Sequence, residues 1–287
     1  MNTMLSVKPV ALSNGLQVRI SAPLTGTGLP VIVFSHGFGQ SLDGYAPLAD
    51  FWATHGFVVV QPTHLDSRTL NVPPDDPRTP LIWRLRRDDL ITVLDELDPI
   101  EDAVPGLAGR LDRDRIAMAG HSWGAQTVGM LLGARVVGVD EEFSDPRVKA
   151  GVLLAAAGRG GADLAPFAAE HFAFMNPDFT TMTTPALIVA GDQDQSQLSV
   201  RGPDWFTDAY HHATGPKSLL TVAGGEHSLG GITGYATTET TDESPERVAL
   251  IQRMSVAYLN SALGIDDSAW QVAQKEDLGP LGHLESF

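Results

Sequence analysis

A serine flanked by glycines is the strongest chemical signal in this sequence. Gly120-His121-Ser122-Trp123-Gly124 follows the predicted strand Arg115–Ala119 and precedes a helical pattern. Between a strand and a helix, Gly-x-Ser-x-Gly predicts a nucleophile elbow, a sharp turn that exposes the serine hydroxyl. A chance turn of small residues is the alternative, and the strand–turn–helix setting favours the elbow. Ser122 is therefore the predicted nucleophile.

A serine hydroxyl is a weak nucleophile at neutral pH, so it needs a base, and that base needs an acid to orient it. Farther along the chain, the predicted strand Ala186–Ala190 runs into Asp192 and Asp194, and the predicted strand Ser218–Val222 runs into His227. We expect His227 to be the base. Asp194 is preferred as the acid because it lies farther into its loop than Asp192, which we expect to be a turn residue.

Three other histidines receive different interpretations. His211 and His212 end an apparent helix, where a positive charge is favoured by the helix dipole. His121 lies inside the predicted elbow, so we expect it beside the nucleophile and in contact with substrate, with no part in proton transfer.

Catalysis of acyl transfer also needs N–H donors that stabilise the oxyanion of the tetrahedral intermediate. The backbone N–H of Trp123, next to the nucleophile, is one predicted donor. The second is expected from Phe38, in the glycine-containing loop that follows the predicted strand Val31–Phe34. The rings of Phe38 and Trp123 are expected to bind substrate in an apolar acyl pocket, with a place in the protein core as the alternative.

The acidic composition argues against a nucleic-acid partner. The chain has a net charge of −16, and its densest basic cluster, Arg84, Arg86 and Arg87, is followed at once by Asp88 and Asp89. Binding to phosphates requires clustered Lys and Arg without such neutralisation. We interpret the cluster as the solvated face of a helix.

Cysteine is absent, which excludes a thiolate nucleophile, disulfides and thiolate metal sites. His, Asp and Glu show no metal-ligand spacing, so no bound metal is expected. The sequence also shows no signal peptide and no apolar run long enough to span a membrane, so a cytoplasmic location is expected.

Strands and helices alternate along the chain, which predicts a mostly parallel sheet with helices on both faces. An opening hairpin is predicted over Val7–Leu12 and Leu16–Ser21, and further strands over Phe57–Val60 and Val152–Ala155. We expect one domain over residues 1–287, with the 265–287 tail packed on it. In such sheets, ligands bind at the carboxyl ends of the strands.

Three helices are delimited by their end signals. Ser41 is the predicted N-cap of a helix that Gly56 ends, and Trp123–Ala134 is predicted to be helical. The last helix is expected to start with Ser244 as N-cap and to end before Gly264.

Taken together, these motifs resemble the α/β-hydrolase superfamily, and within it the branch of chlorophyllases, dienelactone hydrolases and cutinase-like polyester hydrolases. The resemblance rests on His36-Gly37-Phe38, on His55–Val60, on the Ser122 elbow, and on the loops that carry Asp194 and His227. It implies the α/β-hydrolase fold, a Ser-Asp-His triad and no cofactor.

The segment between Ala155 and Pro185 is too short for a large lid domain, so a partly open cleft is expected. We expect Phe172, Phe174, Met175 and Phe179 either to shape this cleft or to belong to the core.

The favoured function is a serine carboxylic-ester hydrolase acting through an acyl-enzyme on a small or polymeric ester. A lactonase, or another enzyme with the same triad such as a perhydrolase or lyase, is the alternative. A binding protein on an inactive hydrolase scaffold is disfavoured because all three triad candidates are present. Oligomeric state, physiological role and the segment Asn71–Pro80 are left without interpretation.

Overall fold

A computed structural model describes residues 3–73, 75–234 and 240–287, so Pro74, within the uninterpreted segment, lies outside the described residues. In these ranges, nine strands form one sheet in the order β1-β2-β4-β3-β5-β7-β9-β10-β11. These strands are β1 (Met4–Ala11), β2 (Gln17–Pro23), β3 (Leu29–Ser35), β4 (Val58–Pro62), β5 (Leu111–His121), β7 (Val148–Leu154), β9 (Ala186–Gly191), β10 (Lys217–Val222) and β11 (Gly282–Ser286). The six strands from β4 to β10 run parallel, and β1, β2 and β11 join antiparallel at the edges.

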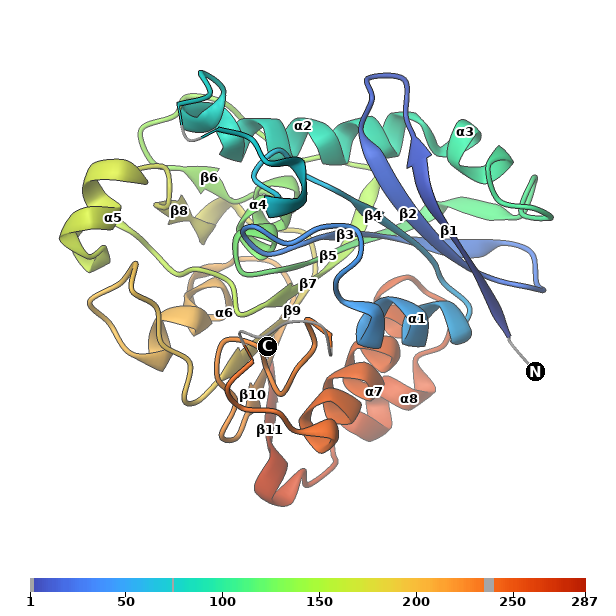
Figure 1. Ribbon diagram of the computed structural model, residues 1–287. Helices are drawn as coiled ribbons and strands as arrows, with labels where there is room; N and C mark the ends of the chain where they lie inside the picture. The colour runs from blue at the N-terminus through green and yellow to red at the C-terminus, as the bar shows by residue number, and fades with distance from the viewer. Residues whose placement is uncertain (1–2, 74, 235–239) are drawn as a thin grey trace.

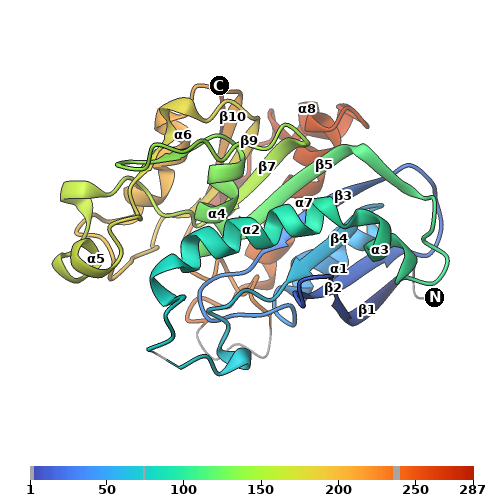
Figure 2. The ribbon, with the colours of Figure 1, turned by 90° about the horizontal axis from the view of Figure 1, so that it is seen from above.

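Helices cover both faces of this sheet (Figure 1). Their bounds are α1 (Ala46–Thr54), α2 (Ile82–Asp95), α3 (Leu97–Asp102), α4 (Trp123–Leu131), α5 (Pro166–His171), α6 (Asp208–His212), α7 (Pro245–Ala262) and α8 (Ser268–Ala273). Helices α2 and α4 pack on one face, and α1 and α7 pack on the other, as the view from above also shows (Figure 2). The predicted fold class is confirmed.

The central strands are apolar because both faces of the sheet are covered. Every residue of β3 and β4 is buried, as expected for parallel strands between two helical layers. The predicted opening hairpin is confirmed as the antiparallel pair β1 and β2. A small separate ladder joins β6 (Arg135–Val136) to β8 (Pro177–Asp178).

Two predicted helix boundaries are wrong. Helix α1 begins at Ala46, and the Ser41 hydroxyl instead accepts a hydrogen bond from the N–H of Asp43 in the preceding turn. Tyr45 lies directly before α1 with φ of 60°, a left-handed conformation that cannot belong to a right-handed helix. Helix α4 ends at Leu131 rather than Ala134, because Gly133 adopts φ of 110° and the chain leaves the helix there.

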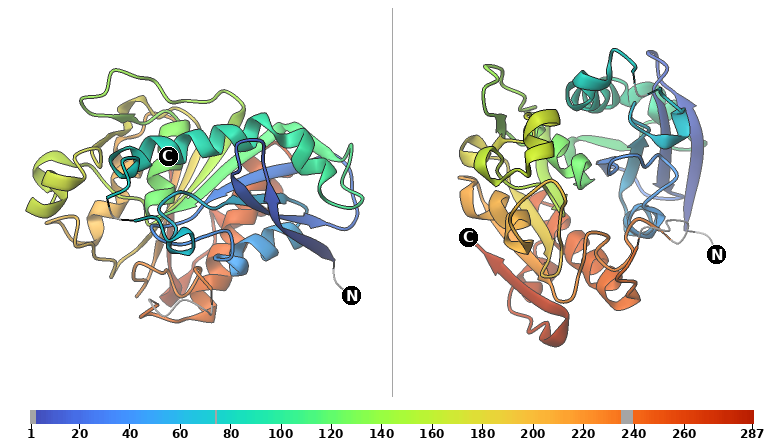
Figure 3. Two further views of the ribbon diagram at one scale, coloured as in Figure 1. Left: turned by 45° about the horizontal axis from the view of Figure 1, so that its top comes forward. Right: turned by 60° about the vertical axis from the view of Figure 1, so that its left-hand side comes forward.

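The last helix follows its end signals, and the tail beyond it adds structure that the sequence did not predict. The Ser244 hydroxyl accepts a hydrogen bond from the N–H of Arg247 at 3.3 Å, and Gly264 has φ of 66° just past the end of α7. The tail then forms α8, whose buried Trp270 contacts Tyr258 of α7. Strand β11 extends the sheet at the edge opposite β1 (Figure 3).

The carboxyl ends of β5, β9 and β10 lie along one edge of the sheet. Ser122 follows β5, Asp194 follows β9, and His227 follows β10. Between β7 and β9 the chain forms only α5, β8 and two short 3-10 turns, so no large lid domain is found among the described residues.

Candidate active site

Ser122 occupies a strained turn between β5 and α4. Its backbone has φ of 55° and ψ of −120°, a conformation that non-glycine residues rarely adopt and that commonly marks functional sites. Both neighbouring glycines are required by close backbone contacts. A Cβ at Gly120 would lie 2.4 Å from the carbonyl oxygen of Gly124, and a Cβ at Gly124 would lie 2.0 Å from that of Ser35. The glycines therefore allow the turn that presents the hydroxyl.

The hydroxyl of Ser122 is hydrogen-bonded to the imidazole of His227, which is paired with the carboxylate of Asp194. The distance is 2.9 Å from Ser122 Oγ to His227 Nε2, and 3.1 and 3.0 Å from His227 Nδ1 to the two carboxylate oxygens. An ionised carboxylate can only accept, so the proton of the neutral ring lies on Nδ1. Nε2 is then free to accept the proton of Ser122.

The environment of Asp194 strengthens this pairing. Its side chain is fully buried, whereas the imidazole of His227 is 42% exposed. Burial raises the pKa of Asp194, and the contact with His227 and a hydrogen bond from the N–H of Gln195 oppose that shift. A carboxylate with little water around it interacts more strongly with an imidazolium than an exposed one would.

The two aspartates after β9 point to different partners. The exposed Asp192 accepts a hydrogen bond from the N–H of Gly224 at 2.7 Å and so ties the β9 loop to the β10 loop. These loops approach closely, since a Cβ at Gly191 would lie 2.1 Å from the carbonyl oxygen of Gly225. The geometry is the one expected for a turn residue at Asp192 and for an acid beside His227 at Asp194.

The loop of Phe38 is held by a buried ion pair. Arg86 Nη1 donates to the carbonyl of His36 at 2.8 Å, Arg86 Nη2 donates to that of Gly37 at 3.3 Å, and the guanidinium also binds Asp66 through two hydrogen bonds of 2.8 Å. Asp66 in turn accepts from the N–H of Gly39 at 3.1 Å. Burial alone would raise the pKa of Asp66, but Arg86 holds it well below its usual range. Arg86 therefore anchors the loop to α2 through the carbonyl groups of the loop.

Two N–H groups remain available beside Ser122. Phe38 follows the anchored carbonyls, and Trp123 is the first residue of α4, where an N–H has no partner within the helix. Across the described ranges, neither N–H donates a hydrogen bond within the protein. The rings of Phe38 and Trp123 lie 4.8 Å apart between centroids.

A cleft of about 360 Å³ opens beside Ser122. It is lined by Phe38, Ser122, Trp123, Ala155, Ala157, Phe167, Phe172, Met175, Ser196, Leu198, Trp205, Phe206 and His227. Except for His227, none of these side chains is ionisable. A cleft of this kind suits an uncharged, apolar group.

The structure decides which of the four residues with two possible places, in the cleft or in the core, line the cleft. Phe172 and Met175 line it, whereas Phe179 is buried in the core and Phe174 stacks on Trp83 behind Trp123. Sequence reasoning missed Phe167, Trp205, Phe206 and Leu198, because nothing in their local pattern shows that their segments fold over the elbow.

His121 is not placed for the substrate contact that we expected. It is 4% exposed and does not line the cleft. Its Nδ1 lies 2.8 Å from the hydroxyl of Tyr45, and its Nε2 lies 2.7 Å from the carbonyl oxygen of His227. Both ring nitrogens are thus engaged inside the protein, because the side chain of the residue before Ser122 points away from the cleft.

The interpretation of the basic cluster as a solvated helix face is wrong at Arg86. Its side chain and that of Asp66 are each only 1% exposed. Arg84 and Arg87, by contrast, are partly exposed and pair with Glu141. The sequence signal was ambiguous because Arg86 faces the sheet while its two basic neighbours on α2 face outward.

A second Ser-His-Asp chain lies beneath the Phe38 loop, and the sequence analysis missed it. His64 Nε2 is 2.9 Å from Ser35 Oγ, and His64 Nδ1 is 2.8 Å from the carboxylate of Asp89. Ser35 and His64 are fully buried and line no part of the cleft. Burial raises the pKa of Asp89 to about 7 and lowers that of His64 well below its usual range. Without access for a substrate, this chain supports the loop above it.

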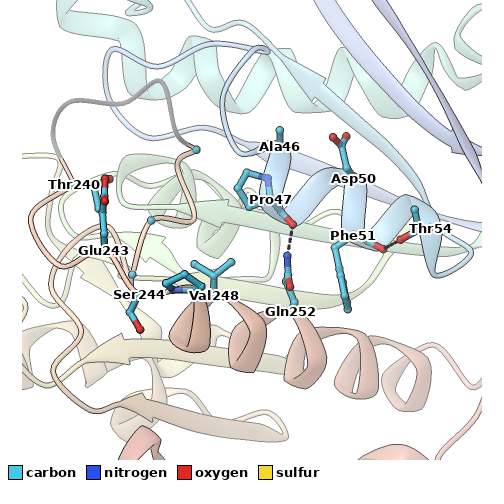
Figure 4. Close-up of a pocket in the computed structure, with 14 residues that line it drawn as sticks. Ala46, Pro47, Asp50, Phe51, Thr54, Thr240, Glu243, Ser244, Val248 and Gln252 are labelled. Carbon is cyan, nitrogen blue, oxygen red and sulfur yellow. Dashed lines mark hydrogen bonds between the residues drawn. The ribbon is translucent and has the colours of Figure 1, made fainter. Parts of the chain in front are cut away.

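A larger hollow of about 570 Å³ lies between α1 and α7 (Figure 4). Pro47 and Phe51 of α1 face Val248 and Gln252 of α7 across it, and Gln252 donates to the carbonyl of Pro47. No triad candidate lines it. The smaller cleft is the one that Ser122 and His227 line.

Within the described residues, no group of three His, Asp or Glu side chains is arranged to hold a metal ion. In the same ranges, no helix has the combination of length and apolar character needed to cross a membrane.

The strand order, the turn at Ser122, and the loops that follow β9 and β10 are those of the α/β-hydrolase fold. A protein-family model described as Chlorophyllase matches residues 3–140, which include Phe38 and Ser122 and end before Asp194 and His227. A platelet-activating factor acetylhydrolase from Cavia porcellus is 28% identical over 144 residues, covering 38% of this chain. The chain covers 33% of the length of that relative. The chain is therefore similar to the chlorophyllase-like branch of the α/β-hydrolases.

Proposed function

We propose that this protein is a serine carboxylic-ester hydrolase that works through an acyl-enzyme. The observation that carries the proposal is the hydrogen-bonded chain from Ser122 through His227 to Asp194, which starts at a strained elbow and opens on an apolar cleft. In this proposal Ser122 is the nucleophile, His227 the general base and acid, and Asp194 the residue that orients the imidazole.

The proposed acylation step follows from the positions of these groups. Ser122 Oγ attacks the ester carbonyl carbon while His227 Nε2 takes the hydroxyl proton, and the carbonyl oxygen becomes an oxyanion. The N–H groups of Phe38 and Trp123 donate to that oxyanion. The intermediate collapses as His227 gives its proton to the leaving alcohol, which leaves the acyl group on Ser122. Water, activated by His227, then releases the acid and restores the serine.

The names of the related proteins support an ester substrate. Chlorophyllase and an acetylhydrolase both point to hydrolysis, and the part of this chain that resembles chlorophyllase carries Phe38 and Ser122. Because no ionisable side chain other than His227 lines the cleft, we propose a neutral ester with an apolar acyl or aromatic group. A charged group there would be desolvated without a partner.

The sheet takes strands from both ends of the chain, β1 and β11, which supports our proposal that residues 1–287 form one domain.

The experiment that tests the function combines a covalent probe with a substrate series. A fluorophosphonate should label Ser122, and Ser122→Ala should abolish both labelling and hydrolysis of p-nitrophenyl esters. Ser196→Ala is the matched control, since Ser196 also lines the cleft but has no histidine partner among the described residues. Labelling of a different serine, or hydrolysis by Ser122→Ala, would contradict the proposal. Acyl chains of increasing length, a lactone and an aromatic polyester then define the substrate, and turnover of the lactone alone would favour a lactonase.

A further inference from the structure

A buried chain of hydrogen bonds connects the Phe38 loop to the backbone of His227. The hydroxyl of Tyr45 lies 3.0 Å from the N–H of Gly37 and 2.8 Å from Nδ1 of His121. Nε2 of His121 lies 2.7 Å from the carbonyl oxygen of His227. We call Tyr45 and His121 the Tyr45–His121 bridge. It touches the loops of the proposed base and of one proposed oxyanion donor.

The chemistry of the two ends allows a single arrangement of protons in this chain. The carbonyl of His227 can only accept, so His121 carries its proton on Nε2 and accepts at Nδ1. The hydroxyl of Tyr45 therefore donates to His121 and accepts from the N–H of Gly37. Burial, with a smaller contribution from the charge of His227, lowers the pKa of His121 to about 3. The ring is thus neutral at the pH at which a serine esterase works, and the arrangement does not change.

Packing fixes the bridge as closely as the hydrogen bonds do. A Cβ at Gly37 would lie 2.8 Å from the Tyr45 hydroxyl and 3.1 Å from Nδ1 of His121, so only glycine fits at that position without displacing the bridge. The Tyr45 ring is fully buried, 4.7 Å from the ring of Phe34, and the His121 ring lies 4.9 Å from that of His227. Tyr45 itself has φ of 60°, and its N–H donates to the carbonyl of Thr233 at 3.0 Å. Backbone strain of this kind persists only where the surroundings hold it in place.

We propose that Tyr45 and His121 are positioning residues that hold the Phe38 loop and the backbone of His227 in register with Ser122. The inference rests on the proposed function. Neither residue reaches the cleft, so neither touches the substrate. The imidazole of His227 and the N–H of Phe38 come from two separate loops. The bridge keeps both groups aligned with the hydroxyl of Ser122.

Loss of the bridge should lower kcat much more than it raises KM. The cleft walls that bind the substrate stay in place, whereas the proposed base and oxyanion donor lose a shared support. Misplacement of catalytic groups by about 1 Å can cost on the order of 100-fold in rate. We therefore expect a 10- to 100-fold fall in kcat, with KM changed by about twofold or less.

Tyr45→Phe tests the bridge, because it removes the hydroxyl and keeps the buried ring. Tyr258→Phe is the matched control: Tyr258 is also buried, and among the described residues its hydroxyl has no hydrogen-bond partner. We expect Tyr45→Phe to lose 10- to 100-fold in kcat and in the rate of fluorophosphonate labelling, and Tyr258→Phe to keep the wild-type values. A folded Tyr45→Phe with kcat within twofold of wild type would overturn the inference.

A second pair of variants decides the question independently, including the case in which Tyr45→Phe does not fold. His121→Gln offers an amide that can still donate to the carbonyl of His227, whereas His121→Leu cannot. We expect the glutamine variant to recover most of the kcat that the leucine variant loses, and equal kcat in the two would count against the bridge. Wild-type labelling at Ser122 serves as the reference in both experiments. If the wild type itself is not labelled there, the proposed function fails, which is distinct from a failure of the bridge.

Discussion

Replacing Asp194 by asparagine should remove most of the activity without altering the fold. The side chain is fully buried, and both carboxylate oxygens lie within 3.1 Å of His227 Nδ1. The N–H of Gln195 also donates to this carboxyl group. In Asp194→Asn the amide oxygen is needed by Gln195, so the amide NH2 turns toward His227 and Nδ1 must accept. The imidazole proton then moves to Nε2, where it faces Ser122 and blocks proton abstraction.

The size of the loss follows from this wrong tautomer. The same substitution in the serine-protease triad lowers kcat about 10⁴-fold. At about 1.36 kcal/mol for each factor of ten, that is about 5.4 kcal/mol of lost transition-state stabilisation. The cleft residues are not altered, so KM should stay within a few-fold of the wild-type value.

Asp192→Asn is the matched control, two positions away in the same loop. The exposed Asp192 accepts from the N–H of Gly224, and an asparagine oxygen can accept the same hydrogen bond. We expect kcat to fall by less than about threefold, since one exposed hydrogen bond contributes little. The assay is kcat and KM on one p-nitrophenyl ester, with circular dichroism to check folding. The reasoning is refuted if Asp192→Asn is the more damaging change, or if a folded Asp194→Asn keeps more than a tenth of the activity.

Three further predictions test the elbow, the buried carboxylate and the absence of a metal requirement. Gly124→Ala should prevent folding or sharply lower the melting temperature, because its Cβ would lie 2.0 Å from the carbonyl oxygen of Ser35. Gly129→Ala is the control in the same helix: no atom lies within 4 Å of the added Cβ, so this change should stabilise the protein by about 0.5–1 kcal/mol. Equal melting temperatures for the two variants would contradict this prediction. Burial raises the pKa of Asp89 to about 7, so the native state holds that proton more tightly than the unfolded state, and the stability it contributes is present below about pH 4 and lost as the pH rises to 7. The lowered pKa values of His64 and His121 make stability rise over the same range, so the effect of Asp89 is read as the difference between the wild type and Asp89→Asn. Urea denaturation at pH 5 and pH 8 should show that the change in stability with rising pH is less favourable by about 2 kcal/mol in the wild type than in Asp89→Asn, and an equal change in both would be evidence against it. EDTA should leave ester hydrolysis unchanged, and activity lost in EDTA and restored by a divalent ion would show that the site has been misread.

Much of the sheet could be predicted because its strands carry a signal within a few residues. The continuous apolar runs of β3, β4 and β9 indicate burial on both faces, and the Ser244 cap fixes the start of α7. Strand β11 gave no such signal. Its residues alternate between half-buried and exposed, and it is a strand because the open edge of β10 offers unpaired backbone groups.

Chain order and spacing were enough to determine several features of this protein: the alternating architecture, the Ser122 elbow, and the late loops that carry Asp194 and His227. These features depend on local backbone geometry, such as the need for glycine at positions 120 and 124. Only the tertiary structure decided that Arg86 is buried and that His121 faces Tyr45 rather than the cleft. The side on which such a residue lies depends on elements distant in sequence, here Asp66, Tyr45 and the backbone of His227, and no local pattern records those contacts.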